Sequence, residues 1–439
     1  MQCLKRKIDF NLNQIMVEEL PWSQGFYREG SIADATFKED VTDYFDYFLK
    51  NQDAMPFYTI QRDSCAALET HFERAYAQLV DAVGRLFCES HATIMQFMGC
   101  DFLRKHPYFI DYARWTFRNH GSARQSLYGR FDAAFDPATE TVKGIYEFNG
   151  DTPTMLFESV NLQSNLCTQV TGSDEPQVNT FWPTLIEELE ERGKVPGFVG
   201  VLFEQRSFED MVTAETLAQI LGQNNTTLFA AFEDIDYDHA CREKPWLIGD
   251  RRLDVVFALS PWEEMVENFP QGYKEWANWA QNVTFLEPAW RWFASNKGIW
   301  AYITHLRESD PAGYGCHWDD VATLATYTSA EPFIRSGLSY VQKPKVGRMS
   351  SNVKVFGDHN ELVHESEGPY TDDCVYQAYC PPGQVEGRNN FIIGMFMVPD
   401  AVEDLDDMYD STAATLCIRE FESPTLSWKN ERFIPHIIV

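Results

Sequence analysis

Two neighbouring segments with alternating polar and apolar residues constrain the fold of this chain most strongly. Residues 128–136 and residues 144–149 have the pattern of strands, and residues 137–141 between them have the composition of a turn. Because successive side chains of a strand point to opposite faces, one face of this hairpin is apolar. The other face carries four polar side chains, which are Arg130, Asp132, Glu147 and Asn149. The pattern predicts a β-hairpin with one face for a core and one for polar chemistry.

Three of these polar side chains offer oxygen ligands, and the fourth is a guanidinium. Oxygen ligands suit Mg²⁺, which completes its coordination with water and substrate phosphates, and an arginine suits phosphoryl charge. The hairpin therefore predicts a magnesium and phosphate site or, as the alternative, a surface hairpin whose polar face is solvated. Directly after it, Thr152 suits a helix N-cap and Pro153 the first helical position. A helix start beside a metal could bind a substrate carboxylate.

The rest of the chain indicates an α+β protein. Its 439 residues allow two or three domains or one multilobed enzyme, and the 44% hydrophobic and 14% aromatic content excludes a disordered chain. Residues 1–120 are predicted to be mainly helical, with apolar residues at three- and four-residue steps over residues 41–49 and 66–87. From residue 126 onward short strand patterns alternate with helices, as is typical of α+β enzymes.

Charge and cysteine content restrict partners and location. The 66 acidic and 36 basic residues give a net charge of −30, which repels nucleic acids and anionic membranes. This charge either favours a cationic substrate or belongs to a solvated surface. The longest apolar run, residues 391–398, is shorter than the roughly 20 residues of a membrane helix. Ten cysteines without a C-x-x-C pair and an N-terminus without an apolar signal region predict a cytoplasmic protein with reduced thiols.

Several common motifs are absent from the sequence. It contains no P-loop, no G-x-G-x-x-G, no G-x-S-x-G and no H-E-x-x-H. The acidic residues 400–410 lack the glycine of a calcium-binding loop and are interpreted as a solvated acidic loop.

An ordered set of motifs resembles the glutathionylspermidine synthase-like ATP-grasp family. The set starts with the hairpin and residues 150–154 and continues through residues 259–263, 286–290, 295–297, 343–348, 352–353, 418–420 and 432–436. The likeness spans nearly the whole chain and corresponds to the stand-alone synthetase, without the amidase domain of bifunctional members. It implies an ATP-grasp fold over residues 121–439, with a substrate-binding lobe inserted at about residues 180–285. It also implies a rearranged order in which metal ligands precede the ATP lysines.

The resemblance further implies roles for individual residues. Arg130 would stabilise the transferring phosphoryl group as the catalytic residue. Two Mg²⁺ ions would be bound by Asp132, Glu147 and Asn149. ATP would be contacted by Arg130, Asp132, Lys297, Lys343, Ser350 and Gln377. Substrate contacts would come from Thr152 for the acyl group, from Glu209 and Asp210 for the amine, and from Arg419 on the substrate side.

The activity implied by the resemblance is ATP-dependent, ADP-forming ligation of a carboxylate to an amine through an acyl phosphate. The acyl substrate would be a peptide or an amino acid, and the net charge and residues 209–210 favour a cationic amine. Two alternatives remain open: an authentic glutathionylspermidine synthase, and a nucleotide-binding regulatory protein without turnover. The second arises because residues 347–350 read Gly-Arg-Met-Ser, whereas the family usually has Gly or Ser, Arg, Glu and Gly.

Overall fold

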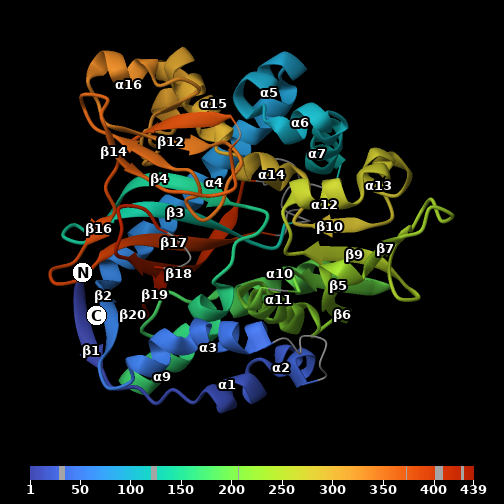
Figure 1. Ribbon diagram of the computed structural model, residues 1–439, viewed down its shortest axis with the longest axis horizontal. Coiled ribbons are helices and arrows are strands. Elements are labelled where there is room, and N and C mark those ends of the chain that lie inside the picture. Colours follow the sequence, from blue (N-terminus) through green and yellow to red (C-terminus); the bar gives the residue numbers. More distant parts are fainter. Residues whose placement is uncertain (29–34, 120–125, 206, 372, 401–408, 427–429) are drawn as a thin grey trace.

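The computed structural model describes residues 1–28, 35–119, 126–205, 207–371, 373–400, 409–426 and 430–439. Helices and four β-sheets are mixed along this described part of the chain, which confirms the α+β class (Figure 1). Most of the predicted acidic loop at residues 400–410 lies outside the described residues. No helix in these ranges is both long and apolar enough to span a bilayer.

The main sheet contains the predicted hairpin. Its strand order is β19-β18-β17-β3-β4, and β16 pairs with β17. All its pairs are antiparallel. The strands are β3 (Gly129–Asp136), β4 (Thr141–Asn149), β16 (Gly383–Gln384), β17 (Asn390–Pro399), β18 (Ser411–Phe421) and β19 (Arg432–Phe433).

Helix α4 (Arg62–Cys88) packs against the apolar face of this sheet (Figure 1). Its buried residues recur at helical steps, among them Phe72, Tyr76, Leu79 and Val83. The ring of Phe72 lies 5.7 Å from that of Phe131 in β3. Because α4 occupies the face with Phe131, the polar face of the hairpin points to the opposite side of the sheet.

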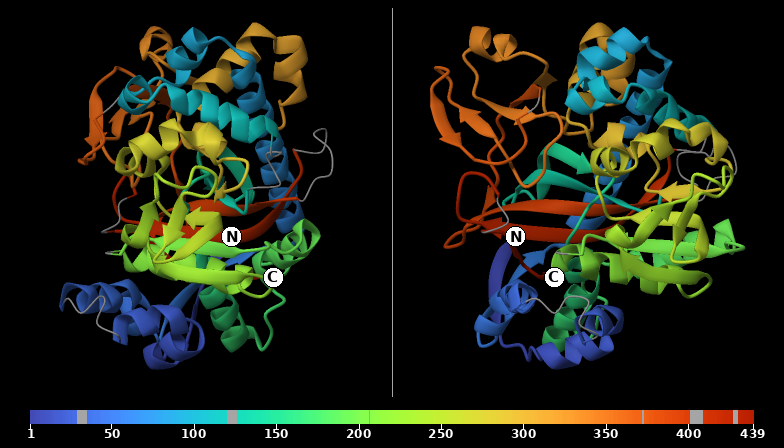
Figure 2. Two further views of the ribbon diagram at one scale, coloured as in Figure 1. Left: turned by 90° about the vertical axis from the view of Figure 1, so that its right-hand side faces the viewer. Right: turned by 45° about the vertical axis from the view of Figure 1, so that its right-hand side comes forward.

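A second sheet forms the 326–378 lobe, which stands over the strands of the main sheet (Figure 2, right). Its order is β11-β15-β12-β13-β14, with antiparallel neighbours. The lobe contains β11 (Thr326–Tyr327), α16 (Glu331–Ser336), β12 (Tyr340–Pro344), β13 (Lys354–Phe356), β14 (Leu362–Glu365) and β15 (Cys374–Ala378). Before it in the chain come α14 (Trp290–Ser295), α15 (Gly298–Ser309) and η4 (Pro311–Gly315).

Residues 180–285 form a third region around the parallel strands β6, β5 and β9 (Figure 1). The sheet order is β6-β5-β9-β8-β7, and β10 also pairs with β9. The elements are α10 (Phe181–Arg192), β5 (Phe198–Phe203), α11 (Phe208–Leu221), β6 (Thr226–Ala231), η2 (Phe232–Asp234), β7 (Ile235–Tyr237), β8 (Trp246–Ile248), β9 (Arg251–Ala258), α12 (Trp262–Asn268), α13 (Pro270–Lys274), η3 (Trp276–Asn278) and β10 (Thr284–Leu286). Parallel strands bring their carboxyl ends, and the loops that follow them, to one edge of a sheet.

The N-terminal region is mainly helical but also contributes two strands that the sequence did not reveal. The helices besides α4 are α1 (Leu12–Glu18), α2 (Pro21–Arg28), α3 (Ala35–Lys50), α5 (His91–Met98), α6 (Asp101–Lys105) and α7 (Tyr108–Asn119). Strands β1 (Gln2–Arg6) and β2 (Met55–Ile60) pair with each other, and β2 also pairs with the C-terminal β20 (His436–Ile438). The two chain ends therefore lie close together (Figure 1).

Candidate active site

A cavity of about 720 Å³ is lined by residues from the main sheet, the 326–378 lobe and the 180–285 region. All twelve residues to which the sequence assigned a role line it, and they are Arg130, Asp132, Glu147, Asn149, Thr152, Glu209, Asp210, Lys297, Lys343, Ser350, Gln377 and Arg419. These residues span 290 positions of the sequence, from 130 to 419. The fold therefore assembles one site from segments that are far apart along the chain.

The polar face of the hairpin lines part of this cavity. Asp132 lies directly opposite Glu147, and Arg130 opposite Asn149, in the register of β3 and β4. Arg130 is 5% exposed and Asp132 is 4% exposed. The alternative of a solvated surface hairpin is therefore wrong for these two residues.

Asp132 is enclosed by two guanidinium groups. Its Oδ1 accepts a hydrogen bond of 2.8 Å from Nε of Arg130 and forms an ion pair of 2.5 Å with Nη2 of Arg419. Nη1 of Arg419 also donates to Glu431 at 2.8 Å. Burial alone would raise the pKa of Asp132, but the two arginines outweigh it and hold this pKa below its usual value. Asp132 is therefore a carboxylate at neutral pH.

Glu147 and Asn149 complete the polar face. Oε2 of Glu147 lies 3.0 Å from Nζ of Lys297, which also donates to the Gly347 carbonyl at 2.7 Å. Burial alone would raise the pKa of Glu147, but the combined effect of Lys297 and Lys343 is larger. The pKa of Glu147 therefore lies below its usual value. Nδ2 of Asn149 donates to Oδ2 of Asp132 at 2.9 Å, which directs the amide of Asn149 toward the carboxylate.

Lys343 and Gln377 bring polar groups to the cavity from the adjacent strands β12 and β15. Nζ of Lys343 donates to Oε1 of Gln377 at 2.6 Å, and Nε2 of Gln377 donates to the Tyr146 carbonyl at 3.3 Å. Burial lowers the pKa of Lys343 to about 8, although Glu147 opposes this shift. Lys343 therefore carries its charge at neutral pH and loses it in mildly alkaline solution.

The loop with the unusual sequence, residues 347–350, is anchored by its arginine. Arg348 donates from Nη1 to Glu263 at 2.6 Å and from Nη2 to Asp151 at 3.2 Å. Met349 and Ser350 both adopt left-handed backbone conformations, with φ of 55° and 50°. Such conformations cost residues other than glycine of order 1 kcal/mol each. Residues 349 and 350 thus adopt a backbone conformation that glycine would adopt with less strain.

The part of the cavity lined by the start of α11 is acidic. Glu209 and Asp210 occupy the first turn of α11, where Oγ of Ser207 accepts a hydrogen bond from the Asp210 amide at 3.2 Å. Burial raises the pKa of Asp210 well above its usual value, and the neighbouring Glu209 and Glu204 raise it further. Burial also raises the pKa of Glu209. A cation bound between these groups would stabilise their charged forms.

Thr152 lines the cavity but does not begin a helix, so its predicted N-cap role is wrong. The carbonyls of Pro153 and Thr154 accept hydrogen bonds from Tyr128 and Arg130 of the hairpin. Met155 then adopts a φ of 64°, and helical structure starts only at residue 156. It continues as the π-helix η1 (Glu158–Leu162) and as α9 (Gln163–Thr171). Side-chain hydrogen bonds and the left-handed residue thus displace the helix start.

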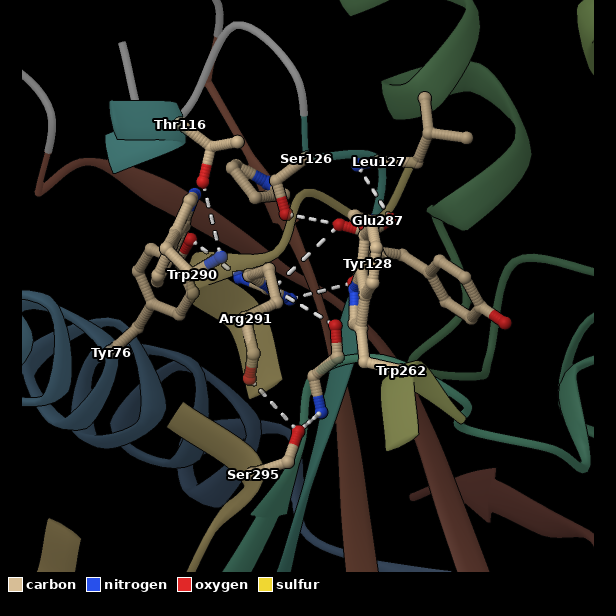
Figure 3. Close-up of polar contacts among 12 residues, drawn as sticks. Tyr76, Thr116, Ser126, Leu127, Tyr128, Trp262, Glu287, Trp290, Arg291 and Ser295 are labelled. Atoms are coloured by element: carbon tan, nitrogen blue, oxygen red, sulfur yellow. Dashed lines mark hydrogen bonds and ion pairs between the residues drawn. The ribbon is translucent and has the colours of Figure 1, made fainter. Parts of the chain in front are cut away.

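A buried ion pair between Glu287 and Arg291 binds the hairpin where β3 begins and β4 ends (Figure 3). Glu287 accepts hydrogen bonds from the amides of Leu127 and Tyr128, at 2.9 and 3.2 Å, just before β3. Arg291 of α14 donates to the carbonyl of Tyr128 at 2.6 Å and to that of Gly150, just after β4, at 3.0 Å. Figure 3 shows these contacts converging on one site. The motif at residues 286–290 therefore positions the hairpin.

Sequence reasoning gave no role to three acidic residues that help to build the site. Glu431 pairs with Arg419, Glu263 pairs with Arg348, and Glu287 holds the start of β3. Glu263 and Glu287 belong to motifs recognised in the sequence, and a charged residue inside such an aromatic segment is a signal of a buried, paired role. Glu431 follows β18 by ten residues and has no comparable local signal.

The donors on the hairpin fit a magnesium ion. Asp132 and Glu147 lie opposite each other on the two strands, and the amide of Asn149 beside them offers a third oxygen atom. Only oxygen donors are present in this set, which matches the preference of Mg²⁺ for a few carboxylates completed by water and phosphate oxygens. Within the described residues, no cluster of three or more histidine, cysteine or acidic side chains has metal-binding geometry. Substrate oxygens would therefore have to complete the coordination.

Residues 42–439 match the glutathionylspermidine synthase preATP-grasp family. The chain belongs to this family. The resemblance inferred from the motifs is thereby confirmed.

Individual relatives of this family member are distant. A putative acid–amine ligase of Haemophilus influenzae is 26% identical over 332 residues, which cover 71% of this chain and 75% of that protein. The trypanothione synthetase of Crithidia fasciculata is 23% identical over 323 residues, and the matched part covers 65% of this chain and 45% of that protein. The chain thus spans less than half of the synthetase. A solved glutathione synthetase-like effector of Globodera pallida superimposes with a TM-score of 0.49 at 10% identity, over 91% of this chain and 96% of that one.

Proposed function

We propose that this protein is an ATP-dependent ligase that joins a carboxylic acid to an amine and forms ADP and phosphate. The observation that carries the proposal is the cavity, which unites the twelve residues implied by the family motifs. Its position between the main sheet and the 326–378 lobe supports an ATP-grasp arrangement. The motif order would be rearranged, because the hairpin residues precede Lys297 and Lys343 in the chain.

The basic side chains would bind and orient the triphosphate. Lys297 and Lys343 bring two positive charges beside Glu147. Arg130 donates a hydrogen bond to Asp132, so each carboxylate of the hairpin has cationic neighbours. Mg²⁺ held by Asp132, Glu147 and Asn149 would neutralise phosphate charge. Arg130 would stabilise the charge that develops on the transferring γ-phosphoryl group.

The substrate carboxylate would attack the γ-phosphorus, and ADP would leave. The acyl phosphate would then be attacked by the amine, with loss of phosphate and formation of the amide. Phosphorylation is required because a carboxylate has no adequate leaving group. Thr152 and Arg419 would contact the acyl substrate, and Glu209 and Asp210 would bind a positive charge on the amine.

The relatives support the reaction class but leave the substrates open. One relative is named as an acid–amine ligase and the other as a trypanothione synthetase. An authentic glutathionylspermidine synthase is therefore one specific form of the proposal. A nucleotide-binding regulatory protein is favoured only by the changed residues at 349 and 350. The anchoring of Arg348 by two carboxylates argues against a lost loop function.

The test is analysis of nucleotide products. The purified protein is incubated with MgATP and a panel of amino acids and peptides, each paired with mono-, di- and polyamines. Phosphate release that requires both an acid and an amine, with ADP formed in equal amount, is the expected result. Formation of AMP in proportion to the amide would contradict the acyl-phosphate mechanism. Thermal stabilisation by ATP without turnover of any pair would favour the regulatory protein.

A further inference from the structure

Residues 422–426, which we call the strap, run from the main sheet toward the 326–378 lobe. The strap follows the last residue of β18, and its residues Pro424, Thr425 and Leu426 line the cavity. Oγ1 of Thr425 lies 2.9 Å from Nε2 of His364, which belongs to β14 at the edge of the lobe sheet. One hydrogen bond thus connects a loop of the main sheet with an edge strand of the lobe.

The strap is firmly attached to the main sheet. The Ser423 carbonyl accepts a hydrogen bond of 3.1 Å from Asn390 at the start of β17. The hydroxyl of Ser423 accepts another of 2.6 Å from Asn430 and itself donates to the Thr425 carbonyl. Pro424 restricts the backbone between these contacts. The hydroxyl of Thr425 is therefore presented to the lobe from a fixed base.

The strap also reaches the residues proposed to bind ATP. Leu426 packs with Ile392 and Phe421 in a small apolar cluster that is separate from the two large cores, and Tyr146 packs against this cluster. Nζ of Lys343 lies 5.5 Å from the centre of the Tyr146 ring. The carbonyl of Tyr146 accepts a hydrogen bond from Gln377. The strap therefore borders the part of the cavity that contains Lys343 and Gln377.

We infer that the hydrogen bond between His364 and Thr425 fixes the 326–378 lobe against the main sheet and thereby sets how long a nucleotide stays in the cavity. This inference rests on the proposed ATP-dependent function. His364 and Thr425 are positioning residues, since neither is assigned a contact with the reacting atoms. Among the residues that the structure describes, β14 pairs with β13 alone, so a contact from the strap restrains the outermost strand of that sheet.

The inference is tested with Thr425→Val, which replaces the hydroxyl by a methyl group at nearly constant size. Release of a fluorescent ATP analogue with Mg²⁺ is followed by stopped flow, and turnover kinetics are measured with each substrate varied. Because one hydrogen bond is lost, nucleotide release and KM for ATP should both rise about two- to tenfold. The rate at saturating ATP and the KM values for acid and amine should change little.

Further variants separate positioning from general destabilisation. Thr425→Ser keeps the hydroxyl and should restore slow release, whereas His364→Ala should match Thr425→Val. The double variant should release nucleotide no faster than the faster of the two single variants, because both changes remove the same hydrogen bond. His359→Ala, at an exposed position of the same lobe, is the matched control and should behave as the wild type.

Two outcomes would overturn the inference. One is nucleotide release from Thr425→Val at the wild-type rate, and the other is additive effects of the two single changes. If the wild type binds no nucleotide, the proposed function fails. Hydrogen exchange of the β14 amides still tests the contact in that case: the exchange should be faster in Thr425→Val than in the wild type and in Thr425→Ser, and equal rates would show that the contact does not restrain the lobe.

Discussion

Two groups of acidic residues in the cavity have their charges balanced in different ways. On the hairpin, each carboxylate is paired with cationic side chains, and the pKa values of Asp132 and Glu147 lie below their usual value although burial opposes this. On α11, burial and neighbouring acids raise the pKa values of Glu209 and Asp210. The hairpin residues are therefore already balanced in charge. The α11 residues have an excess of acid that a bound cation would balance.

This difference indicates which ligand each group receives. Carboxylates that are already paired with cationic side chains are charged before a metal ion or phosphate binds, so no proton has to be released on binding. Buried carboxylates that face one another are costly when charged, and a cationic amine would relieve this cost. The following predictions test this contrast, and they begin with the largest expected effect.

Replacing Glu147 by Gln on the hairpin should have the largest effect on turnover. The change keeps side-chain size but removes one charge from the proposed metal site, so turnover should fall by about 100-fold or more at saturating Mg²⁺. The thermal unfolding temperature should change little, because the side chain is partly exposed. Phosphate release and thermal unfolding are the measurements. Glu331→Gln, on the surface of α16, is the control, and near-normal turnover of Glu147→Gln would remove the metal assignment.

The pH dependence of folding stability at Glu158, a buried neighbour of Glu209, tests the cost of the acidic residues near α11. Burial, helped by Glu209, raises its pKa from 4.5 to about 8, so the folded state holds a proton that the unfolded state releases. Ionisation of the buried Glu158 therefore costs the folded state nothing below pH 4.5. As the pH rises from 4.5 to about 8, the free energy of unfolding falls by a few kcal/mol. Glu158→Gln should therefore gain stability over the wild type between pH 5 and pH 8. Denaturant unfolding at both pH values measures it, and parallel pH profiles of the two proteins would contradict the proposed charge excess.

Combined replacement of Glu209 by Gln and Asp210 by Asn should affect the amine alone. Two charged contacts would be lost, so KM for a cationic amine should rise roughly ten- to hundredfold while KM for ATP stays nearly constant. Steady-state kinetics with each substrate varied provide the comparison. An equal rise in both KM values would place these residues outside amine recognition.

Salt should produce the smallest effect. Raising the ionic strength to about 0.3 M should increase KM for a cationic amine about two- to threefold, because screening weakens its attraction to Glu209 and Asp210. A neutral amine of similar size should show no such dependence. If both amines respond alike, the net charge of −30 reflects only a solvated surface.

Sequence patterns revealed the elements with local signals. Alternation predicted the β3–β4 hairpin, and helical periodicity predicted most of α4. Family motifs identified twelve residues that the fold brings to one cavity, although their individual roles remain predictions. Local patterns did not reveal the pairing of β2 with β20, because these strands are almost the whole chain apart. They also misplaced the helix after Pro153, because hydrogen bonds from the distant hairpin override local helix preference there.

The contacts of Glu287 and Arg291 have a consequence for the alignment of β3 with β4. A slip of one residue between these strands would turn Phe131 into the cavity and Asp132 into the core. In many hairpins the connecting turn prevents such a slip, but here both strands are bound to α14 at the end opposite the turn. Changes in the turn should therefore leave the alignment of Asp132 and Glu147 intact, whereas a defect in α14 would disturb it.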